Sequence, residues 1–225
     1  MSQNIILGLD CATRWTNLGV SIDGTVIGEI NVNIGREQAS KLPELVNKLL
    51  DLTDIALNQI SAVALTVGPG YFTGVRVGLA YGCALAKGLG ISVIPLTTLE
   101  VMAFPVVRMG VVAIPIIWAG RGGVYCAAYD NKDGEMNVLC PPLFCCATNL
   151  HEIATRISSD VPSQWLCDDK SRIMTLFPEE KVSNCIHLIP SGGNIAQLGH
   201  IRRNMNTPAD RVQAYYLREP DFGKN

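Results

Sequence analysis

The chain has 225 residues, which is long enough for one large domain or two smaller lobes that bury about 70 % of the unfolded surface. Its formal net charge is −2, and charged residues make up 17 % of the sequence. This balance excludes a free-standing nucleic-acid binder, which must neutralise many phosphates. The low share of charge also predicts that another subunit covers part of the apolar surface.

The first half of the chain predicts alternating strands and helices. A continuous apolar run ends in Asp10, as in a buried strand that delivers a polar group at its carboxyl end. Asp23 and Gly24 form a two-residue hairpin signal between two further strands. Apolar residues at helical spacing begin at Leu42. We expect strands at residues 4–10, 17–22, 25–31, 61–68 and 91–96, and helices that begin at residues 42 and 74.

The second half repeats this order more faintly. Strands are expected at residues 111–117, 123–130, 136–140 and 164–167, and helices near 148–158 and 193–204. Two passes through strand, strand, strand, helix, strand and helix describe a duplicated α/β lobe. The predicted fold class is therefore the actin-like ATPase fold (ASKHA, ribonuclease H-like), with an N-terminal lobe at residues 1–105 and a smaller C-terminal lobe at 106–225.

The turn after the first strand is a candidate ligand site in such a fold. In the sequence DCAT, Asp10 can hold a metal-bound water, while Thr13 and the neighbouring amides meet phosphate oxygens. Asp and Thr also bond the backbone of their own turn, and the sequence leaves both interpretations open. The matching loop of the second half, WAGRGGVY, has glycines but no aspartate before Asp130, so one half of a nucleotide clamp is missing.

The segment GPGYFTG at residues 68–74 indicates a loop that contacts a ligand or a neighbouring loop. Gly68 and Gly70 permit backbone conformations that other residues avoid, and Thr73 can cap the helix that begins near Gly74. The loop is not a P-loop, because no Gly-Lys-Ser/Thr follows. The glycine spacing also differs from that of a dinucleotide fingerprint.

Small residues recur every four positions along the next helix, at Gly74, Gly78, Gly82, Ala86 and Gly90. They lie near one face of the helix and form a groove. Each interior glycine costs about 1 kcal/mol against alanine, so close approach by another helix is the expected compensation. The groove is predicted to meet a second polypeptide, with packing inside the chain as the alternative.

The cysteines and histidines do not predict a metal site. The eight cysteines lie mostly in apolar runs without a C-x-x-C pair, so reduced core thiols are expected. The three histidines lack the i, i+4 spacing of a helical metal grip. The segment SGGN that begins at Ser191 fits either a phosphate-binding turn or a capped helix start.

The protein is expected to be cytoplasmic and not to bind a membrane. The start, MSQNIILGLDCATRW, lacks the basic leader and the small-residue cleavage site of a signal peptide. The glycine-rich helix contains Arg76 and Lys87 and falls short of the ~20 apolar residues of a membrane span.

Four segments resemble the TsaB (YeaZ) family, which is needed to make threonylcarbamoyladenosine in tRNA. They are ILGLDCAT at residues 6–13, VGPGYFTGVRVGLAYGCALAKGL at 67–89, AGRGGVYCAAYD at 119–130 and YYLREPD at 215–221. The resemblance spans most of the chain and is weak between residues 131 and 205. The sequence departs from the family at Ala39-Ser40, where many members have His-Ser, and at Tyr71, where Ser is usual.

The resemblance implies an actin-like fold without catalysis of its own. It implies a scaffold subunit that binds and organises the TsaD catalytic subunit through helices of the first lobe, and an ATPase, TsaE, that joins the pair. No cofactor is required, although ATP or ADP is a candidate ligand at the complex interface. The complex alone would reach tRNA, and the isolated chain is expected to form a homodimer.

Two sets of residues are expected to take part. The set for the partner interface is Gly74, Gly78, Gly82, Ala86 and Arg76. The set for the loop and a possible ligand is Asp10, Thr13, Gly68, Pro69, Gly70, Phe72 and Thr73. The alternative function is a nucleotide-dependent phosphotransferase or hydrolase of the actin-like class, with Asp10 and Thr13 around a metal-nucleotide. A peptidase lacks both a nucleophile constellation and metal ligands in this sequence.

Overall fold

The structure, a computed structural model, describes residues 3–120, 122–146, 162–176 and 184–218. The first half forms β1 (Ile5–Asp10), β2 (Trp15–Ile22), β3 (Thr25–Asn33), α1 (Gln38–Leu52), β4 (Ala62–Thr66), α2 (Phe72–Leu89), β5 (Ser92–Leu96) and α3 (Thr98–Val107). The second half forms β6 (Val112–Gly120), β7 (Gly123–Lys132), β8 (Glu135–Cys146), β9 (Ser163–Cys167), α5 (Lys170–Leu176), β10 (Ile186–His187) and α7 (Gly192–Ile201). The sequence prediction missed α3, α5 and β10, and its helix at 148–158 lies outside the described residues.

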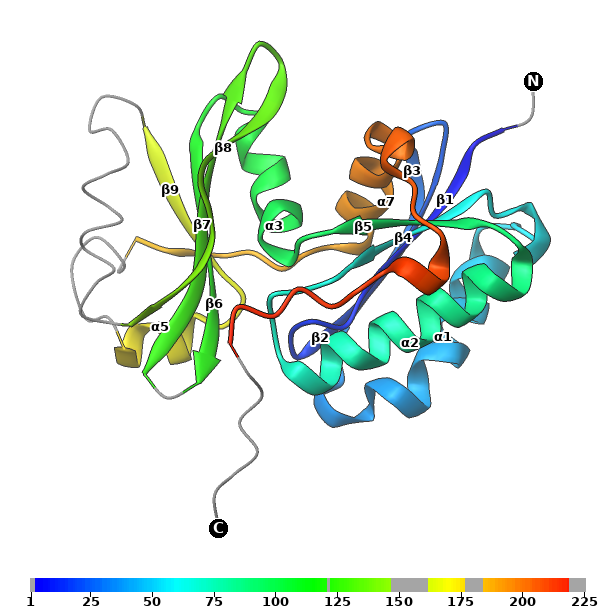
Figure 1. The fold of residues 1–225 in the computed structure, drawn as a ribbon, viewed down its shortest axis with the longest axis horizontal. Coiled ribbons are helices and arrows are strands. Elements are labelled where there is room, and N and C mark those ends of the chain that lie inside the picture. The colour runs from blue at the N-terminus through cyan, green and yellow to red at the C-terminus, as the bar shows by residue number, and fades with distance from the viewer. Residues whose placement is uncertain (1–2, 121, 147–161, 177–183, 219–225) are drawn as a thin grey trace.

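Two mixed sheets form the centres of two lobes (Figure 1). The first sheet has the order β3-β2-β1-β4-β5, and the second has the order β8-β7-β6-β9-β10. In each sheet the first three strands along the chain are antiparallel neighbours, and the later two run parallel to the first. The two sheets therefore repeat one topology, which confirms the predicted duplicated lobe.

The hairpin turns follow the predicted signals. Asp23 and Gly24 have φ values of 50° and 82°, and Asp133 and Gly134 have φ values of 56° and 86°. Positive φ at both central residues is typical of the two-residue turn whose twist matches the flanking strands. These turns hold β2 against β3 and β7 against β8.

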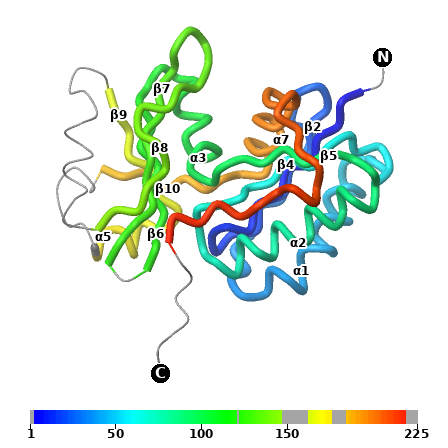
Figure 2. Tube along the Cα trace, viewed as in Figure 1, coloured from blue at the N-terminus to red at the C-terminus, as the bar shows by residue number. Residues whose placement is uncertain are grey.

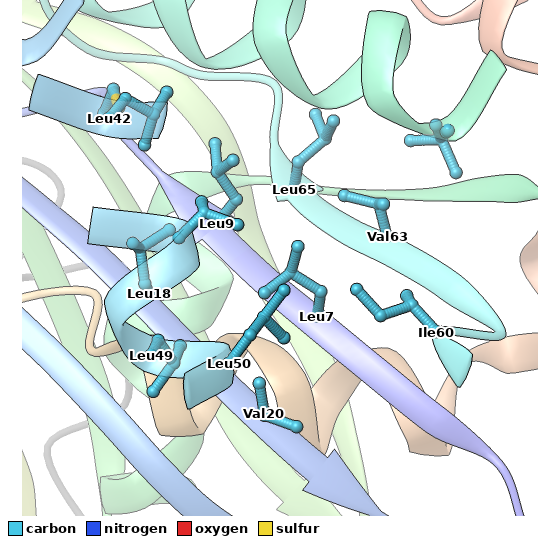
Figure 3. Close-up of a cluster of buried hydrophobic side chains, with 14 of the residues drawn as sticks. Leu7, Leu9, Leu18, Val20, Leu42, Leu49, Leu50, Ile60, Val63 and Leu65 are labelled. Atoms are coloured by element: carbon cyan, nitrogen blue, oxygen red, sulfur yellow. The ribbon is translucent and has the colours of Figure 1, made fainter. Parts of the chain in front are cut away.

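Helices cover both faces of the first sheet. α1 and α2 pack on one face, and α7 packs on the other (Figure 1). Leu7 and Leu9 of β1 join the apolar cluster beneath α1 and α2, which Figure 3 shows, together with Leu49 of α1. Ile6 instead joins a cluster with Ile195 of α7. The apolar run of β1 is continuous because both faces of this strand are buried.

Two helices are exchanged between the lobes. α3 comes from the first half of the chain and packs on β6 and β7, while α7 comes from the second half and packs on β1 and β2. The division predicted between residues 105 and 106 falls inside α3. α7 approaches the sheet so closely that a Cβ at Gly192 would lie 1.9 Å from the carbonyl oxygen of Leu18. Each lobe thus depends on a helix from the other half of the chain.

The residues after α7 run from the first lobe to the second (Figure 2). Thr207 forms a bridge with β5, and the amide of Tyr215 donates to the carbonyl oxygen of Val67 at 2.7 Å. Leu217 then packs against the apolar core of the second lobe. This segment, residues 207–218, is called the C-terminal strap below.

The prediction of core thiols holds for five of the eight cysteines, whereas Cys83 and Cys140 are partly exposed and Cys146 is exposed. Cys11, Cys126, Cys145, Cys167 and Cys185 are buried, and each belongs to an apolar cluster. As for the membrane, the helices that the structure describes are all too short or too polar to span one.

Candidate functional site

Asp10 is fully buried at the end of β1, and its own chain satisfies its carboxylate. Oδ1 accepts from the amide of Ala12 at 3.0 Å and from the hydroxyl of Thr66 at 2.5 Å, and Oδ2 accepts from the side-chain amide of Asn17 at 2.9 Å. Burial raises the pKa of Asp10 to about 6, against the opposing effect of these hydrogen bonds. These bonds agree with the interpretation in which Asp10 holds its own turn.

Gln38, the first residue of α1, closes the same turn from the other side. Its Nε2 donates to the carbonyl oxygens of Cys11, Thr13 and Trp15 at 3.3, 3.1 and 2.9 Å. Thr13 is 1 % exposed, and its hydroxyl accepts from the amide of Trp15 at 3.2 Å. The polar groups of this turn are thus largely occupied within the chain.

The N-terminus of α2 packs directly on this turn. The amide of Tyr71 donates to the carbonyl oxygen of Ala12 at 2.7 Å, and a Cβ at Gly70 would lie 2.2 Å from that oxygen. Gly68 has a φ of 107°, in agreement with the loop prediction, and Pro69 beside it is buried. A helix N-terminus binds anions through its amides, and here the amide of Tyr71, the N-cap residue, is already bonded to the carbonyl of Ala12. The GPG loop serves close packing of α2 on the first turn.

The structure corrects the predicted start of α2. The helix begins at Phe72 with Tyr71 as its N-cap and without a side-chain capping bond, so Thr73 does not cap it. Arg76 follows one turn later at the surface. Its guanidinium carbon lies 3.7 Å from the ring centroid of Phe72, and its Nε donates to the hydroxyl of Tyr216 in the C-terminal strap at 3.3 Å.

The small-residue strip of α2 faces the protein's own sheet, which corrects the predicted contact with a second chain. The buried members of the strip are Gly74, Gly78, Gly82 and Ala86. A Cβ at Gly74 would lie 1.9 Å from the carbonyl oxygen of Cys11, and a Cβ at Gly82 would lie 2.6 Å from Cδ2 of Leu65. The glycines let α2 lie directly on β1 and β4, so packing within the lobe compensates for their cost.

The opposite side of α2 is open to solvent and is called the outer face of α2 below. Its exposed residues are Thr73, Arg76, Ala80, Ala84, Lys87 and Gly88. The helix contains no acidic residue. The neighbouring α1 is more polar, since Glu44 on its surface forms ion pairs with Lys41 at 3.8 Å and Lys48 at 2.7 Å. The exposed side chains of α2 are therefore mostly small and carry little charge, whereas those of α1 include several charged groups.

A cleft of about 810 Å³ lies between the lobes, beside the N-terminus of α2. We call it the arginine cleft, because Arg14, Arg36 and Arg172 line it together with Tyr71 and Trp118. Within the part of the chain that the structure describes, no carboxylate lines this cleft. Its walls therefore offer positive charge and aromatic surface. Asp10 is not among the residues that line it.

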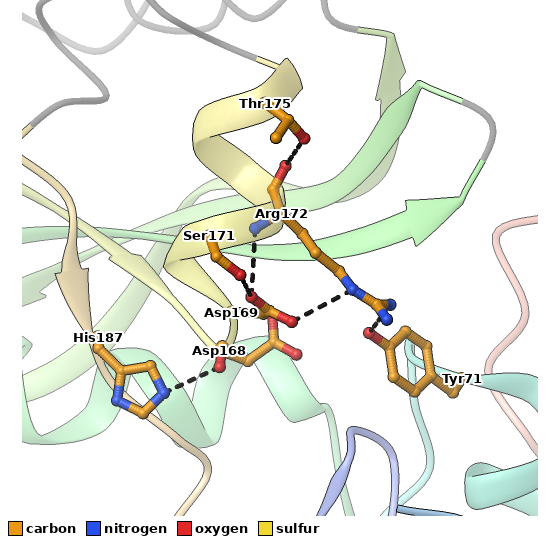
Figure 4. A network of polar contacts seen from close by, with 7 residues as sticks. All are labelled: Tyr71, Asp168, Asp169, Ser171, Arg172, Thr175 and His187. Carbon is orange, nitrogen blue, oxygen red and sulfur yellow. Dashed lines mark hydrogen bonds and ion pairs between the residues drawn. The ribbon is translucent and has the colours of Figure 1, made fainter.

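Arg172 connects the two lobes across this cleft (Figure 4). Its Nη1 donates to the hydroxyl of Tyr71 at 3.1 Å, its Nε lies 3.3 Å from Oδ2 of Asp169, and its guanidinium carbon lies 4.6 Å from the ring centroid of Trp118. Tyr71 and Trp118 also meet edge to face at 6.1 Å. Burial raises the pKa of Tyr71 to about 12, so its hydroxyl is neutral and can accept this bond. No role was predicted for Tyr71 from the sequence.

Asp168 is a second buried carboxylate at the lobe boundary. It directly follows β9 and is 4 % exposed, and its Oδ1 has no hydrogen-bond partner among the described residues. Burial raises the pKa of Asp168 to about 7, and the charges of Asp169 and Asp10 act in the same direction. The sequence prediction looked for an aspartate before Asp130 and missed this one. The available signal was a buried strand that ends in Asp, as in β1.

The segment that begins at Ser191 is a capped helix start. The hydroxyl of Ser191 accepts a hydrogen bond from the amide of Asn194 in the first turn of α7. The amides of Gly192 and Gly193 donate to the side chains of Asn31 and Glu29 at 2.9 and 2.8 Å. These side chains occupy the place where a phosphate would sit. Over the described ranges, no group of three or more His, Cys, Asp or Glu side chains is arranged to hold a metal.

Similarity to known proteins identifies the family to which the chain belongs. The family model of TsaD, tRNA N6-adenosine threonylcarbamoyltransferase, matches residues 32–196. The tRNA threonylcarbamoyladenosine biosynthesis protein TsaB of Bacillus subtilis (strain 168) is 29 % identical over 136 residues, which is 60 % of this chain and 59 % of the relative. The TsaB protein of Escherichia coli (strain K12) is 34 % identical over 94 residues, which is 42 % of this chain and 40 % of the relative. The chain thus spans about half the length of these curated relatives.

Solved structures show the fold over nearly the whole chain. "YeaZ from Pseudomonas aeruginosa" has a TM-score of 0.77 at 22 % identity and covers 95 % of this chain and 100 % of that one. The ethanolamine utilization protein EutJ from Carboxydothermus hydrogenoformans has a TM-score of 0.52 at 12 % identity, with 88 % and 90 % covered. The predicted actin-like α/β fold is confirmed. The chain belongs to the family of the TsaD model, and its predicted resemblance to the TsaB (YeaZ) proteins is confirmed.

Proposed function

We propose that this chain is a non-catalytic subunit in the biosynthesis of threonylcarbamoyladenosine in tRNA, and that it binds and organises a TsaD-type catalytic subunit. Family membership supports the pathway, because the curated TsaB relatives are named for it. One observation carries the non-catalytic part: both carboxylate oxygens of Asp10 are bonded within the chain. A metal-nucleotide at this turn would also need to reach the carboxylate, and Asp10 is fully buried.

The outer face of α2 is the surface that we assign to the catalytic subunit. Ala80 and Ala84 lie along it, and small residues let another helix approach closely. Arg76 and Lys87 stand at its two ends without an acidic residue on the helix. This proposal keeps the helix of the sequence prediction but uses its opposite face, because the glycines are covered by the first sheet.

The second candidate is a nucleotide-dependent phosphotransferase or hydrolase of the actin-like class. The arginine cleft favours it, since this cleft lies between the lobes and carries positive charge. The turn after β1 argues against it, because Gln38 and Asp10 take up polar groups of that turn and the carbonyl of Ala12 meets the N-terminus of α2. We therefore rank this function second.

Two measurements on the full chain separate these functions. Purified chain incubated with ATP and Mg²⁺ should show no turnover. Sustained hydrolysis that disappears in Asp10→Ala would instead establish the enzyme. In the second measurement, the chain is mixed with TsaD from the same cell and analysed by size-exclusion chromatography. A stable complex is expected, and its absence would reject the scaffold function.

The proposal extends to further partners. TsaE joins the pair, tRNA is reached only through the complex, and any ATP or ADP binds at the complex interface and not as a required cofactor of this chain. The isolated chain forms a homodimer through the outer face of α2. Mass photometry tests this last part, since added TsaD should replace the second copy and a homodimer that persists would contradict it.

A further inference from the structure

We propose that the arginine cleft receives an acidic segment of the protein partner that docks on α2. This inference rests on the proposed function, because it assigns a second contact to the same partner. The groups that enter the cleft are side-chain carboxylates on a flexible segment of the partner. The alternatives, a nucleotide or a free phosphate, are outcomes of the test described below.

The positive charge of the cleft favours an acidic ligand. Arg14 and Arg36 are exposed, and neither side chain has an ion pair or hydrogen bond among the described residues. Asp169 attracts Arg14, but its oxygens are already bonded to Ser171 and Arg172. The whole chain has a net charge of −2, so this concentration of cations is local. Unpaired guanidinium groups bind carboxylates with two parallel hydrogen bonds.

The walls of the cleft suit a carboxylate better than a nucleotide. Phosphate sites are built from free backbone amides, but the amide of Tyr71, which lines this cleft, is bonded to the carbonyl oxygen of Ala12. The ring of Trp118 is covered by the guanidinium of a lining arginine and by a tyrosine edge, so it offers little area for stacking a base. The long side chains of the exposed arginines can instead adjust their conformation to bind a carboxylate on a mobile peptide.

The cleft is continuous with the surface assigned to the partner. Thr73 and Val77 of α2 line it, as does Ala39 of α1. Thr73 also belongs to the outer face of α2. A partner helix seated on this face therefore brings its adjoining loop to the mouth of the cleft. One partner can fill both sites at once.

The double variant Arg14→Ala/Arg36→Ala tests the inference. Its affinity for TsaD from the same cell is measured by calorimetry at low and at high salt. We expect roughly tenfold weaker binding at low salt and a smaller difference at high salt, because screening weakens such contacts. Arg14→Lys/Arg36→Lys keeps the charge and should lose less affinity. The matched control is Lys132→Ala/Arg203→Ala, which removes the same charge from exposed positions outside the cleft.

Each outcome has a definite meaning. Equal affinities of the wild type and the arginine variant overturn the cleft contact and leave docking on α2 intact, whereas no binding by the wild type overturns both. Equal weakening in the matched control shows a general charge effect and also overturns the cleft contact. ATP and inorganic phosphate are titrated separately into the isolated chain. Saturable binding that is lost in the arginine variant assigns the cleft to a phosphate ligand and overturns the acidic segment.

Discussion

Asp10 and Asp168 show how hydrogen bonding decides the chemistry of a buried carboxylate. Both follow or end a buried strand, and burial raises the pKa of both. Asp10 has three donors that stabilise its charged form, whereas Oδ1 of Asp168 has no partner among the described residues, and hydrogen bonds from the amides of Asp168 itself and Trp118 offset burial only in part. A buried carboxylate without enough donors favours the protonated form. Of these two carboxylates, Asp168 is therefore the one whose titration should affect stability more.

Asp168→Asn should remove this effect of pH. The folded state raises the pKa from 3.8 to about 7, so folded protein binds the proton more tightly than the unfolded chain does. The stability that this group contributes is full below about pH 4 and is lost as the pH rises through 7. Above pH 7 the variant should be more stable than the wild type, by up to about 4 kcal/mol. Urea unfolding across this range measures the difference, which should vanish in acid.

The control for this measurement is Asp54→Asn, at an exposed position after α1. Its free energy of unfolding should follow that of the wild type at every pH. If Asp168→Asn behaves in the same way, Asp168 does not carry a raised pKa in the folded protein.

Single residues also show where sequence reasoning stops. Asp10 was a visible candidate because it ends an apolar run, but its donors, Asn17 and Thr66, come from β2 and β4. Gln38 had no signal at all, since a neutral amide in a helix start is ordinary until its three carbonyl partners are known. Such contacts depend on distant segments that meet only in the fold.

At the scale of elements, α2 was predicted correctly and its orientation was not. Spacing shows which residues share a helix face, but it does not show what packs against that face. α3 was missed for a related reason. Nearly all of its residues are buried, so it lacks the alternation of apolar and polar faces that marks a surface helix. The capping box of Thr97 and Glu100 was the signal that could have located it.

Two substitutions on α2 distinguish its faces. Gly82→Leu places a side chain against Leu65, where even a Cβ would lie at 2.6 Å, and should lower the free energy of unfolding by about 1–3 kcal/mol or more. Ala80→Leu lies on the outer face and should change stability by no more than about 0.5 kcal/mol while weakening the complex with TsaD. Thermal unfolding and binding are measured on both. A fully stable Gly82→Leu that loses only binding would restore the glycine strip as the partner surface.

The whole molecule is held together by more than its two sheets. The repeated sheet order was predictable from the order of strands, because each half follows the same local rules. The exchange of α3 and α7 was not, since no local pattern shows which sheet a helix will cover. Tyr71 with Arg172 and the C-terminal strap add two further connections between the lobes.

Removal of the C-terminal strap should destabilise the whole molecule. A chain that ends at Asn206 loses the bridge of Thr207 to β5, the bond from Tyr215 to Val67 and the apolar contact of Leu217. Its thermal midpoint should fall by several degrees, by about 2–4 °C for each kcal/mol lost in a domain of this size. A chain that ends at Arg218 keeps the strap and is the reference. Equal midpoints for the two chains would show that the strap contributes no stability.

The exchanged helices also determine when the first lobe can finish folding in the cell. A ribosome releases the N-terminus first, yet the side of β1 that carries Ile6 lacks a covering helix until α7, which begins at Gly192, has emerged. The nascent protein therefore presents an apolar sheet surface while the residues between β1 and α7 are being made. Chaperones that shield such surfaces should act on this half of the molecule, and release it when α7 arrives.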